Sequence, residues 1–263
     1  MTVLDGIMAR KADEVAARRA ARPDRELEAA CRDRPPPHDF GGALSPRGGP
    51  ARIIAEVKRA SPSAGAIAAD LDAVAQARRD AAAGAAAISV LTVGPGFGGS
   101  LDDLAAVRAA VETPLLRKDF VLDRYQLLEA RLAGGDAVLL IVAALSDAAL
   151  RRLLDDAAAL SLAALVEVHD DLELDRALAV GARLVGVNNR DLRTFAVDLA
   201  TSERLLPRLP LEVKGGAESG VRTAADARRL RAAGAPNLLV GEALVRAADP
   251  GALLREMTAE ATP

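Results

Sequence analysis

Short apolar runs alternate with longer amphipathic segments from residue 51 onward. Eight of these runs are rich in Val, Ile, Leu and Ala and are bounded by glycine, proline or charged residues: 51–58, 85–92, 114–119, 136–143, 162–168, 183–189, 211–219 and 237–243. The segments between them, such as 101–111 and 147–160, repeat apolar residues at helical spacing. The apolar runs predict buried parallel strands, and the amphipathic segments predict the crossover helices that join them.

The number of strand–helix units decides between two architectures. Eight units fit a (β/α)8 barrel, whereas a doubly wound sheet commonly has five or six strands. Glycines that precede several runs (Gly84, Gly135, Gly181 and Gly234) are typical of helix C-caps. We therefore expect an α/β protein with one domain over residues 1–263, a (β/α)8 TIM barrel.

Residues 1–50 precede the first predicted strand. Over residues 3–20, an apolar helical face is formed by Val3, Leu4, Ile7, Met8 and Val15. A second short helix is predicted before the proline-rich segment that ends near residue 40. We expect a helical N-terminal extension that packs on the barrel, and the alternative is a solvated tail.

Composition narrows the class of function. The net charge of -3 and the pI of about 5.6 disfavour a nucleic-acid-binding protein. No apolar run approaches the roughly 20 residues of a membrane span, and the N-terminus lacks the apolar region of a signal peptide. The single cysteine, Cys31, excludes an internal disulfide, and with two histidines a structural zinc site is not expected. We expect a cytoplasmic protein that is a monomer or a weak homodimer.

Polar residues gather where six of the predicted strands end. Buried Lys and Glu are unfavourable unless they are paired, and active sites of (β/α)8 barrels lie at the carboxyl ends of the strands. The residues at these ends are Glu56 and Lys58, Lys118 and Asp119, Glu167 and His169, Asn188 to Arg190, Glu218 and Ser219, and Gly241 and Glu242. Any one of them is compatible with a structural ion pair, but the set predicts an active site.

The loops after the seventh and eighth predicted strands, ESGVRT and GEALVR, predict a phosphate site. Barrels bind phosphate there through backbone N–H groups at the start of a helix. Lys58 would add a charged contact, and Glu242 is expected to point away because a carboxylate repels phosphate.

Residues 94–99, GPGFGG, match a dinucleotide-binding pattern. They belong to the second of eight units, and Pro95 stiffens the turn. We therefore favour a loop that presents Phe97 at the barrel mouth, where Phe97 and Phe120 would sandwich a planar group.

Seven motifs of the chain, taken in order, closely resemble the indole-3-glycerol phosphate synthase family. They are EVKRASPSAG, FGGSLDDL, LRKDF, LVEVHD, GVNNRDLRTF, AESGVR and LVGEALVR, and residues 4–20 resemble the leading helix of the family. The resemblance implies a (β/α)8 barrel that closes a ring without metal or cofactor. Its substrate would be a phosphorylated anthranilate-sugar, 1-(2-carboxyphenylamino)-1-deoxyribulose 5-phosphate, and its products indole-3-glycerol phosphate, carbon dioxide and water.

The same resemblance implies residue roles. Lys118 matches the general acid that protonates the substrate carbonyl, and Glu167 matches a carboxyl group that transfers protons during dehydration. Further catalytic positions are Glu56, Lys58, Asn188 and Glu218. The expected substrate or phosphate neighbours, in addition to Lys58, are Arg59, Ser61, Phe97, Phe120, Arg190, Ser219, Gly220, Gly241 and Glu242.

The choice of lysine at position 118 fits this chemistry independently. Only four of the 34 basic residues are lysines, yet Lys58 and Lys118 both close predicted strands. Arginine does not release a proton near neutral pH, whereas a lysine whose pKa is lowered by a second ammonium does. The carboxylates of Glu56 and Glu167 would oppose that shift.

Two departures from the family are visible. Gly215 and Gly216 stand where branched apolar residues are expected in the seventh strand, which predicts a local cavity or bulge compensated by neighbouring side chains. Residues 93–97 replace a charged, doubly aromatic loop, so loop closure over the substrate is expected to differ.

Three alternatives stay open at this point. One is another phosphosugar barrel such as phosphoribosylanthranilate isomerase, although Cys31 lies in the extension and not at a strand end. Another is an aldolase that uses Lys118 or Lys58 as a Schiff-base nucleophile. The third is a non-catalytic barrel that acts as a binding protein.

Overall fold

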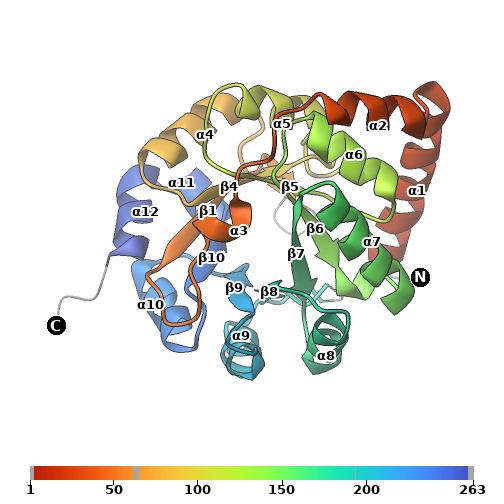
Figure 1. The fold of residues 1–263 in the computed structure, drawn as a ribbon. Helices are drawn as coiled ribbons and strands as arrows, with labels where there is room; N and C mark the ends of the chain where they lie inside the picture. The colour runs from red at the N-terminus through yellow and green to blue at the C-terminus, as the bar shows by residue number, and fades with distance from the viewer. Residues whose placement is uncertain (1–2, 62–64, 193, 260–263) are drawn as a thin grey trace.

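Eight parallel strands close into a barrel in the computed structural model, which describes residues 3–61, 65–192 and 194–259 (Figure 1). The strands are β1 (Arg52–Val57), β4 (Ala87–Leu91), β5 (Leu115–Lys118), β6 (Ala137–Ile141), β7 (Ala163–Val168), β8 (Leu184–Asn188), β9 (Lys214–Glu218) and β10 (Asn237–Val240). Closure is complete because β1 pairs in parallel with both β4 and β10. Every strand of the barrel lies within a predicted run, and the (β/α)8 prediction is confirmed.

A small hairpin that was not predicted follows β1. It pairs β2 (Ala60–Ser61) with β3 (Gly65–Ala66) in antiparallel orientation. Two-residue strands carry too little periodicity to be distinguished from a turn in the sequence.

Helices surround the barrel on all sides. They are α4 (Ala73–Ala82), α5 (Leu101–Arg108), α6 (Arg124–Leu132), α7 (Asp147–Ala159), α8 (Asp171–Ala179), α9 (Ala200–Leu205), α10 (Ala224–Ala232), α11 (Glu242–Arg246) and α12 (Pro250–Thr258), with 3-10 turns η1 (Val142–Ala144) and η2 (Leu206–Arg208). Most begin at a side chain that accepts a hydrogen bond from a first-turn N–H, as Asp72, Ser100 and Thr223 do. None of the helices in the described ranges is long and apolar enough to cross a membrane.

Three of the four glycines predicted to end helices have the expected left-handed backbone. Gly84, Gly181 and Gly234 have positive φ, but before β6 it is Gly134, and not Gly135, that has a positive φ.

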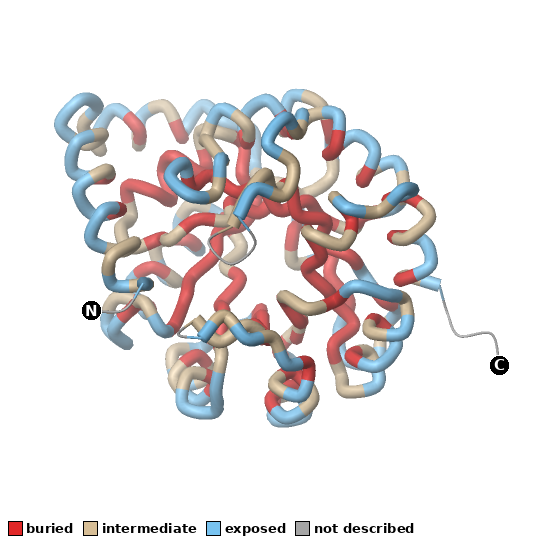
Figure 2. Tube along the Cα trace, turned by 180° about the vertical axis from the view of Figure 1, so that it is seen from behind, coloured by how far each residue is buried: buried red, intermediate tan, exposed pale blue. Residues whose placement is uncertain are grey.

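Burial follows the layers of the barrel. Buried residues run along the strands and the inner faces of the helices, and exposed residues lie outside (Figure 2).

Alternate residues of each strand point into the barrel. The middle of the interior is apolar and is filled by Ile54, Ala87, Leu116, Ala137, Leu139, Leu165, Leu184 and Leu239. Toward the carboxyl ends of β1, β5, β7, β8 and β9 the inward positions become polar. The apolar layer therefore forms a rigid floor under the polar side chains.

The N-terminal extension is helical and packs on the barrel, as predicted. It contains α1 (Val3–Ala21), α2 (Asp24–Arg32) and α3 (Phe40–Ala43), and both α1 and α2 contact α6. The Nε atom of Arg18 lies 2.7 Å from Glu129 Oε1. The buried Lys11 ammonium lies 3.1 Å from Asp119 Oδ1, so α1 is bound to the end of β5 through an ion pair withdrawn from solvent.

The extension also covers the amino ends of the strands. Phe40 and Leu44 are buried against the interior apolar cluster. Lys214 Nζ donates to the backbone oxygens of Gly41 and Leu44 at 2.6 and 2.8 Å. Asn237 exchanges two hydrogen bonds with the backbone of Ser45 at 2.9 and 3.0 Å. This end of the barrel is closed, and the polar end is open.

The Gly215–Gly216 pair leaves only a small void. Strand β9 keeps a continuous register with β8 and β10, so it has no bulge. The cavity beside the glycines is about 10 Å³, close to the lower limit for one water molecule. Leu206 and Leu209 occupy the space next to Gly215, where an added Cβ would come within 2.6 Å of Leu209 Cδ1. The predicted cavity is therefore present, and neighbouring leucines compensate for it.

Candidate active site

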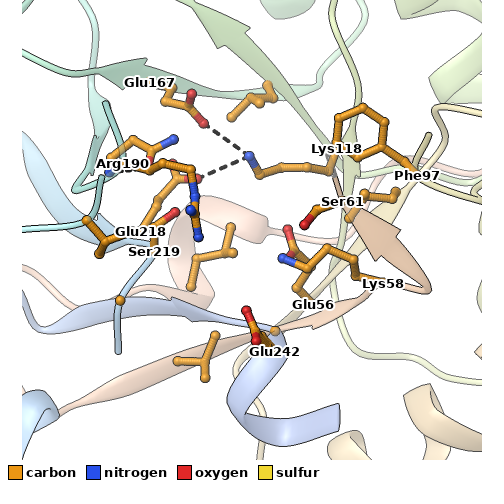
Figure 3. Close-up of a pocket in the computed structure, with 18 of the residues that line it drawn as sticks. Glu56, Lys58, Ser61, Phe97, Lys118, Glu167, Arg190, Glu218, Ser219 and Glu242 are labelled. Carbon is orange, nitrogen blue, oxygen red and sulfur yellow. Dashed lines mark hydrogen bonds and ion pairs between the residues drawn. The ribbon is translucent and has the colours of Figure 1, made fainter. Parts of the chain in front are cut away.

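A cavity of about 490 Å³ opens at the carboxyl ends of the strands (Figure 3). Its volume lies in the range of small-molecule sites, about 300–1,000 Å³. Fourteen of the fifteen predicted site residues line it: Glu56, Lys58, Ser61, Phe97, Lys118, Phe120, Glu167, Asn188, Arg190, Glu218, Ser219, Gly220, Gly241 and Glu242. Six strands thus bring their terminal polar residues to one place.

Arg59 is the exception. Its guanidinium makes two bonds to Asp103, at 2.8 and 2.9 Å, and donates to the backbone oxygens of Leu71 and Gly98. Arg59 is not among the residues that line the cavity, so its contact with substrate stays a prediction. Arg59 instead ties the segment after β1 to the loop before α5.

Lys118 lies at the centre of the polar cluster. Its Nζ atom is 3.0 Å from Glu167 Oε2 and 3.2 Å from Glu218 Oε2, so strands β5, β7 and β9 meet at one ammonium (Figure 3). Burial alone would lower the pKa of Lys118, but the carboxylates of Glu167, Glu218 and Glu56 outweigh it and raise the pKa. The second ammonium, Lys58, is itself paired with Glu56. Of the two opposing effects that the sequence left open, the carboxylates therefore dominate and favour the protonated form of Lys118.

The two carboxylates that hold Lys118 differ in their protonation. Burial opposes ionisation of Glu167, but Lys118 and His169 outweigh it and lower the pKa of Glu167. For Glu218, burial and the neighbouring charge of Glu167 outweigh Lys118 and raise its pKa to about 7. Two carboxyl groups whose environments move their pKa values apart are typical of sites that run acid and base steps together.

Two glycines make room for these carboxylates. An added Cβ at Gly186 on β8 would overlap Glu218 Oε1, and one at Gly241 would overlap the carboxylate of Glu56. Gly186 was not among the predicted site residues, because an interior glycine in an apolar run gives no sign of what faces it.

One wall of the cavity is apolar. Val3, Leu4 and Ile7 of α1 line it, although the sequence predicted that this face packs against the barrel. Val3 is 51% exposed, which fits a position at the cavity rim. Phe97 and Phe120 were predicted to sandwich a planar group, and here they contact each other edge to face with centroids 5.9 Å apart.

The glycines of the loop that presents Phe97 are explained by the backbone geometry of the loop, without a bound nucleotide. Gly96 and Gly98 have positive φ, and Gly99 N donates to Val93 O at 2.9 Å. An added Cβ at Gly99 would collide with the backbone of Leu91. The glycines permit a tight turn that folds back on β4.

The cavity also has cationic side chains in its lining. It is lined by Lys58, Arg190, Arg222 and Arg246, together with Ser219 and Gly220, whose φ angles are 63° and 84°. Arg222 and Arg246 were not predicted, because Arg222 just before α10 and Arg246 at the end of α11 resemble ordinary surface arginines in the sequence. Glu242 was expected to point away, but it is among the lining residues. Its carboxylate accepts a hydrogen bond from Arg246 at 2.9 Å, which offsets its charge.

Comparison with known proteins gives one consistent result. Residues 4–257 match the family model described as indole-3-glycerol phosphate synthase. An indole-3-glycerol phosphate synthase of Nocardioides sp. is 52% identical over 258 residues, which cover 98% of each chain. Indole-3-glycerol phosphate synthase 2 of Streptomyces coelicolor is 49% identical over 253 residues, covering 96% of this chain and 97% of the relative.

Among solved structures, the barrel is similar to that of a 3-hexulose-6-phosphate synthase. The TM-score is 0.61 at 21% identity, covering 79% of this chain and 98% of the other. At this identity the likeness shows the fold alone.

Proposed function

Since the chain belongs to the indole-3-glycerol phosphate synthase family, we propose that its cavity converts 1-(2-carboxyphenylamino)-1-deoxyribulose 5-phosphate to indole-3-glycerol phosphate, carbon dioxide and water. It is accordingly a carbon–carbon lyase of tryptophan biosynthesis. The observation that carries the proposal is the Lys118 ammonium held between Glu167 and Glu218 at the base of the cavity.

The lining of the cavity suits this substrate. The apolar side chains of α1, together with Phe97 and Phe120, fit the anthranilate ring, and the cationic side chains fit the carboxylate and the phosphate. The loops after β9 and β10 add Ser219, Gly220 and Gly241 to the lining, at the place where barrels commonly bind phosphate.

In the first step, the ring carbon that carries the carboxylate attacks the ketone carbon and forms the new carbon–carbon bond. The ketone oxygen takes a proton from Lys118, and carbon dioxide then leaves with the return of ring aromaticity. General acids of this kind contribute about 10²–10⁴-fold to rate. The paired carboxylates keep Lys118 protonated in the resting site but also make it a weaker acid, so its proton moves only to the strongly basic oxygen that forms as the ketone carbon is attacked.

Dehydration then removes the hydroxyl as water. The departing hydroxyl takes a proton from Glu218, whose pKa is raised to about 7, while a second proton leaves the anilino nitrogen. Once Lys118 has given up its proton, the cation that lowers the pKa of Glu167 most strongly is neutral. Glu167 thereby becomes a stronger base at the stage when a proton must leave the anilino nitrogen. The ion pair that stabilises the resting site thus couples the acid step to the base step.

The same geometry disfavours the Schiff-base alternative. An amine nucleophile must be neutral, whereas both carboxylate neighbours favour the charged form of Lys118. Cys31 belongs to α2, and its thiol is buried against the backbone oxygen of Leu128, so it is not placed to serve as the acid of an isomerase.

The test is to mix the protein with the substrate and follow indole fluorescence. The chain has no tryptophan, so its own signal is low. We expect Lys118→Arg, which keeps the charge but holds its proton, to lower kcat about 10²–10⁴-fold. Lys58→Arg is the matched control and should chiefly raise KM. No signal from folded wild-type protein would refute the proposal, and equal losses of kcat in both variants would refute the role of Lys118.

A further inference from the structure

His169 follows β7 and lies behind Glu167, outside the lining of the cavity. Its Nε2 atom is 3.3 Å from Glu167 Oε1, and its Nδ1 atom is 2.9 Å from Glu173 Oε2. Its backbone N–H donates to the same Glu173 oxygen at 2.8 Å. The imidazole is 11% exposed, so these two carboxylates dominate its surroundings.

Glu173 is itself fixed by the start of α8. Asp170 caps that helix and accepts a hydrogen bond from Glu173 N at 2.9 Å. The position of Glu173 therefore depends on a helix end, and the position of His169 depends on Glu173. A continuous line of contacts runs from α8 through the imidazole to Glu167.

The charges along this line alternate. Glu167 and Glu173 are the charged groups that face the imidazole, and beyond Glu167 lies Lys118. Burial alone would lower the pKa of His169, but the two carboxylates outweigh it and raise the pKa to about 10. At neutral pH the ring is then an imidazolium, and both of its nitrogens are donors.

We propose that His169 is a positioning residue that fixes the orientation of Glu167 and keeps it ionised. Oε1 of Glu167 is held by His169, which leaves Oε2 directed at Lys118 and the cavity. When Lys118 loses its proton during turnover, His169 remains as the cation beside Glu167. This inference rests on the proposed function, because it assigns the imidazole a task in the proton transfer by Glu167.

The kinetic test compares two substitutions at His169 whose amide nitrogens lie next to different carboxylates. In His169→Gln the amide nitrogen takes the place of Nε2 beside Glu167, but without charge. In His169→Asn the amide nitrogen takes the place of Nδ1 and reaches only Glu173. A misplacement of about 1 Å at a catalytic group lowers rate on the order of 100-fold. We therefore expect the Asn variant to lose about 10- to 100-fold in kcat with KM little changed, and the Gln variant to lose less.

Both variants should also move the acid limb of the pH profile of kcat/KM to higher pH, because Glu167 has lost a cation. A purely structural role for His169 would leave that limb in place. The matched control is His38→Asn, which changes the other histidine of the chain at the closed end of the barrel and should leave kcat and the profile unchanged.

A second measurement does not depend on turnover. The chain has two histidines, so the spectrum of His38→Asn assigns the imidazole resonances of His169 by NMR. We expect His169 to titrate near 10 in the wild type and closer to its ordinary 6.5 in Glu173→Gln.

A wild-type titration near 6.5, or an Asn variant with wild-type kcat and pH profile, would overturn the inference. Failure of the proposed function is distinguishable, because wild-type protein would then make no indole product while the NMR titration still reports the charge of His169.

Discussion

Replacing Gly186 by alanine tests whether the missing side chain on β8 sets the position of Glu218. The backbone of Gly186 lies outside the left-handed region, so alanine fits it without strain. The added Cβ would overlap Glu218 Oε1, and ordinary contact begins at 3.4 Å. The carboxylate would have to retreat by more than about 1 Å to reach that distance.

This retreat affects chemistry more than folding. The displaced atom is the far end of a flexible side chain, and Gly→Ala in a compatible backbone changes stability by only about 0.4–1 kcal/mol. Glu218 Oε2, however, is one of two carboxylate oxygens on Lys118, at 3.2 Å. Displacement of a catalytic group by about 1 Å can lower rate on the order of 100-fold, which corresponds to about 2.7 kcal/mol in the barrier.

The assay compares kcat/KM from indole fluorescence with the urea midpoint of each variant. Gly215→Ala is the matched control, because its added Cβ meets Leu206 and Leu209 and not the cavity. We expect Gly186→Ala to lose activity with little change in stability, and Gly215→Ala to do the reverse. In a Glu218→Gln background, Gly186→Ala should cause a smaller further loss. Activity of Gly186→Ala within threefold of wild type, a difference of less than about 0.7 kcal/mol in the barrier, would refute the reasoning.

Two further predictions concern stability. Lys11→Met removes one partner of the buried ion pair with Asp119, so the free energy of unfolding in urea should fall by about 3–5 kcal/mol. The control is Arg10→Met at an exposed position, which should change the free energy of unfolding by less than about 0.5 kcal/mol. Similar values for the two variants would contradict a buried ion pair. The pKa of Glu218 is raised to about 7 from 4.5, so its contribution to stability is full below pH 4.5 and is lost as the pH rises through 7. Unfolding midpoints measured across that window should fall more steeply in the wild type than in Glu218→Gln, and parallel curves would contradict the shift.

The strands were predictable because each is a short apolar run bounded by turn residues, and buried parallel strands have that pattern. The polar residues at their ends were predictable as a group for the same reason. The partners with which these polar residues form ion pairs were not predictable. Lys118 and Lys58 are equivalent in the sequence, but only the fold places Lys58 on Glu56 and leaves Lys118 between two other carboxylates.

The errors have a common physical origin. Hydrophobic periodicity identifies an apolar face but not its partner, so Val3 and Ile7 were assigned to the barrel surface although they line the cavity. Proximity in sequence is also a weak guide at a strand end. Arg59 is adjacent to Lys58, yet the chain turns there, and the two side chains separate toward Asp103 and Glu56.

The N-terminal extension has contacts at both ends of the barrel, and this has a consequence for the order in which the chain folds on the ribosome. Ser45 pairs with Asn237, 192 residues further along, and Gly41 accepts from Lys214, 173 residues away. At synthesis rates of about 5–20 residues per second, Ser45 waits roughly 10–40 s for its partner to emerge. Residues 40–45 are thus made early but are among the last to dock, and until then Phe40 and Leu44 are without the barrel interior that buries them and are apolar surface to which a chaperone can bind.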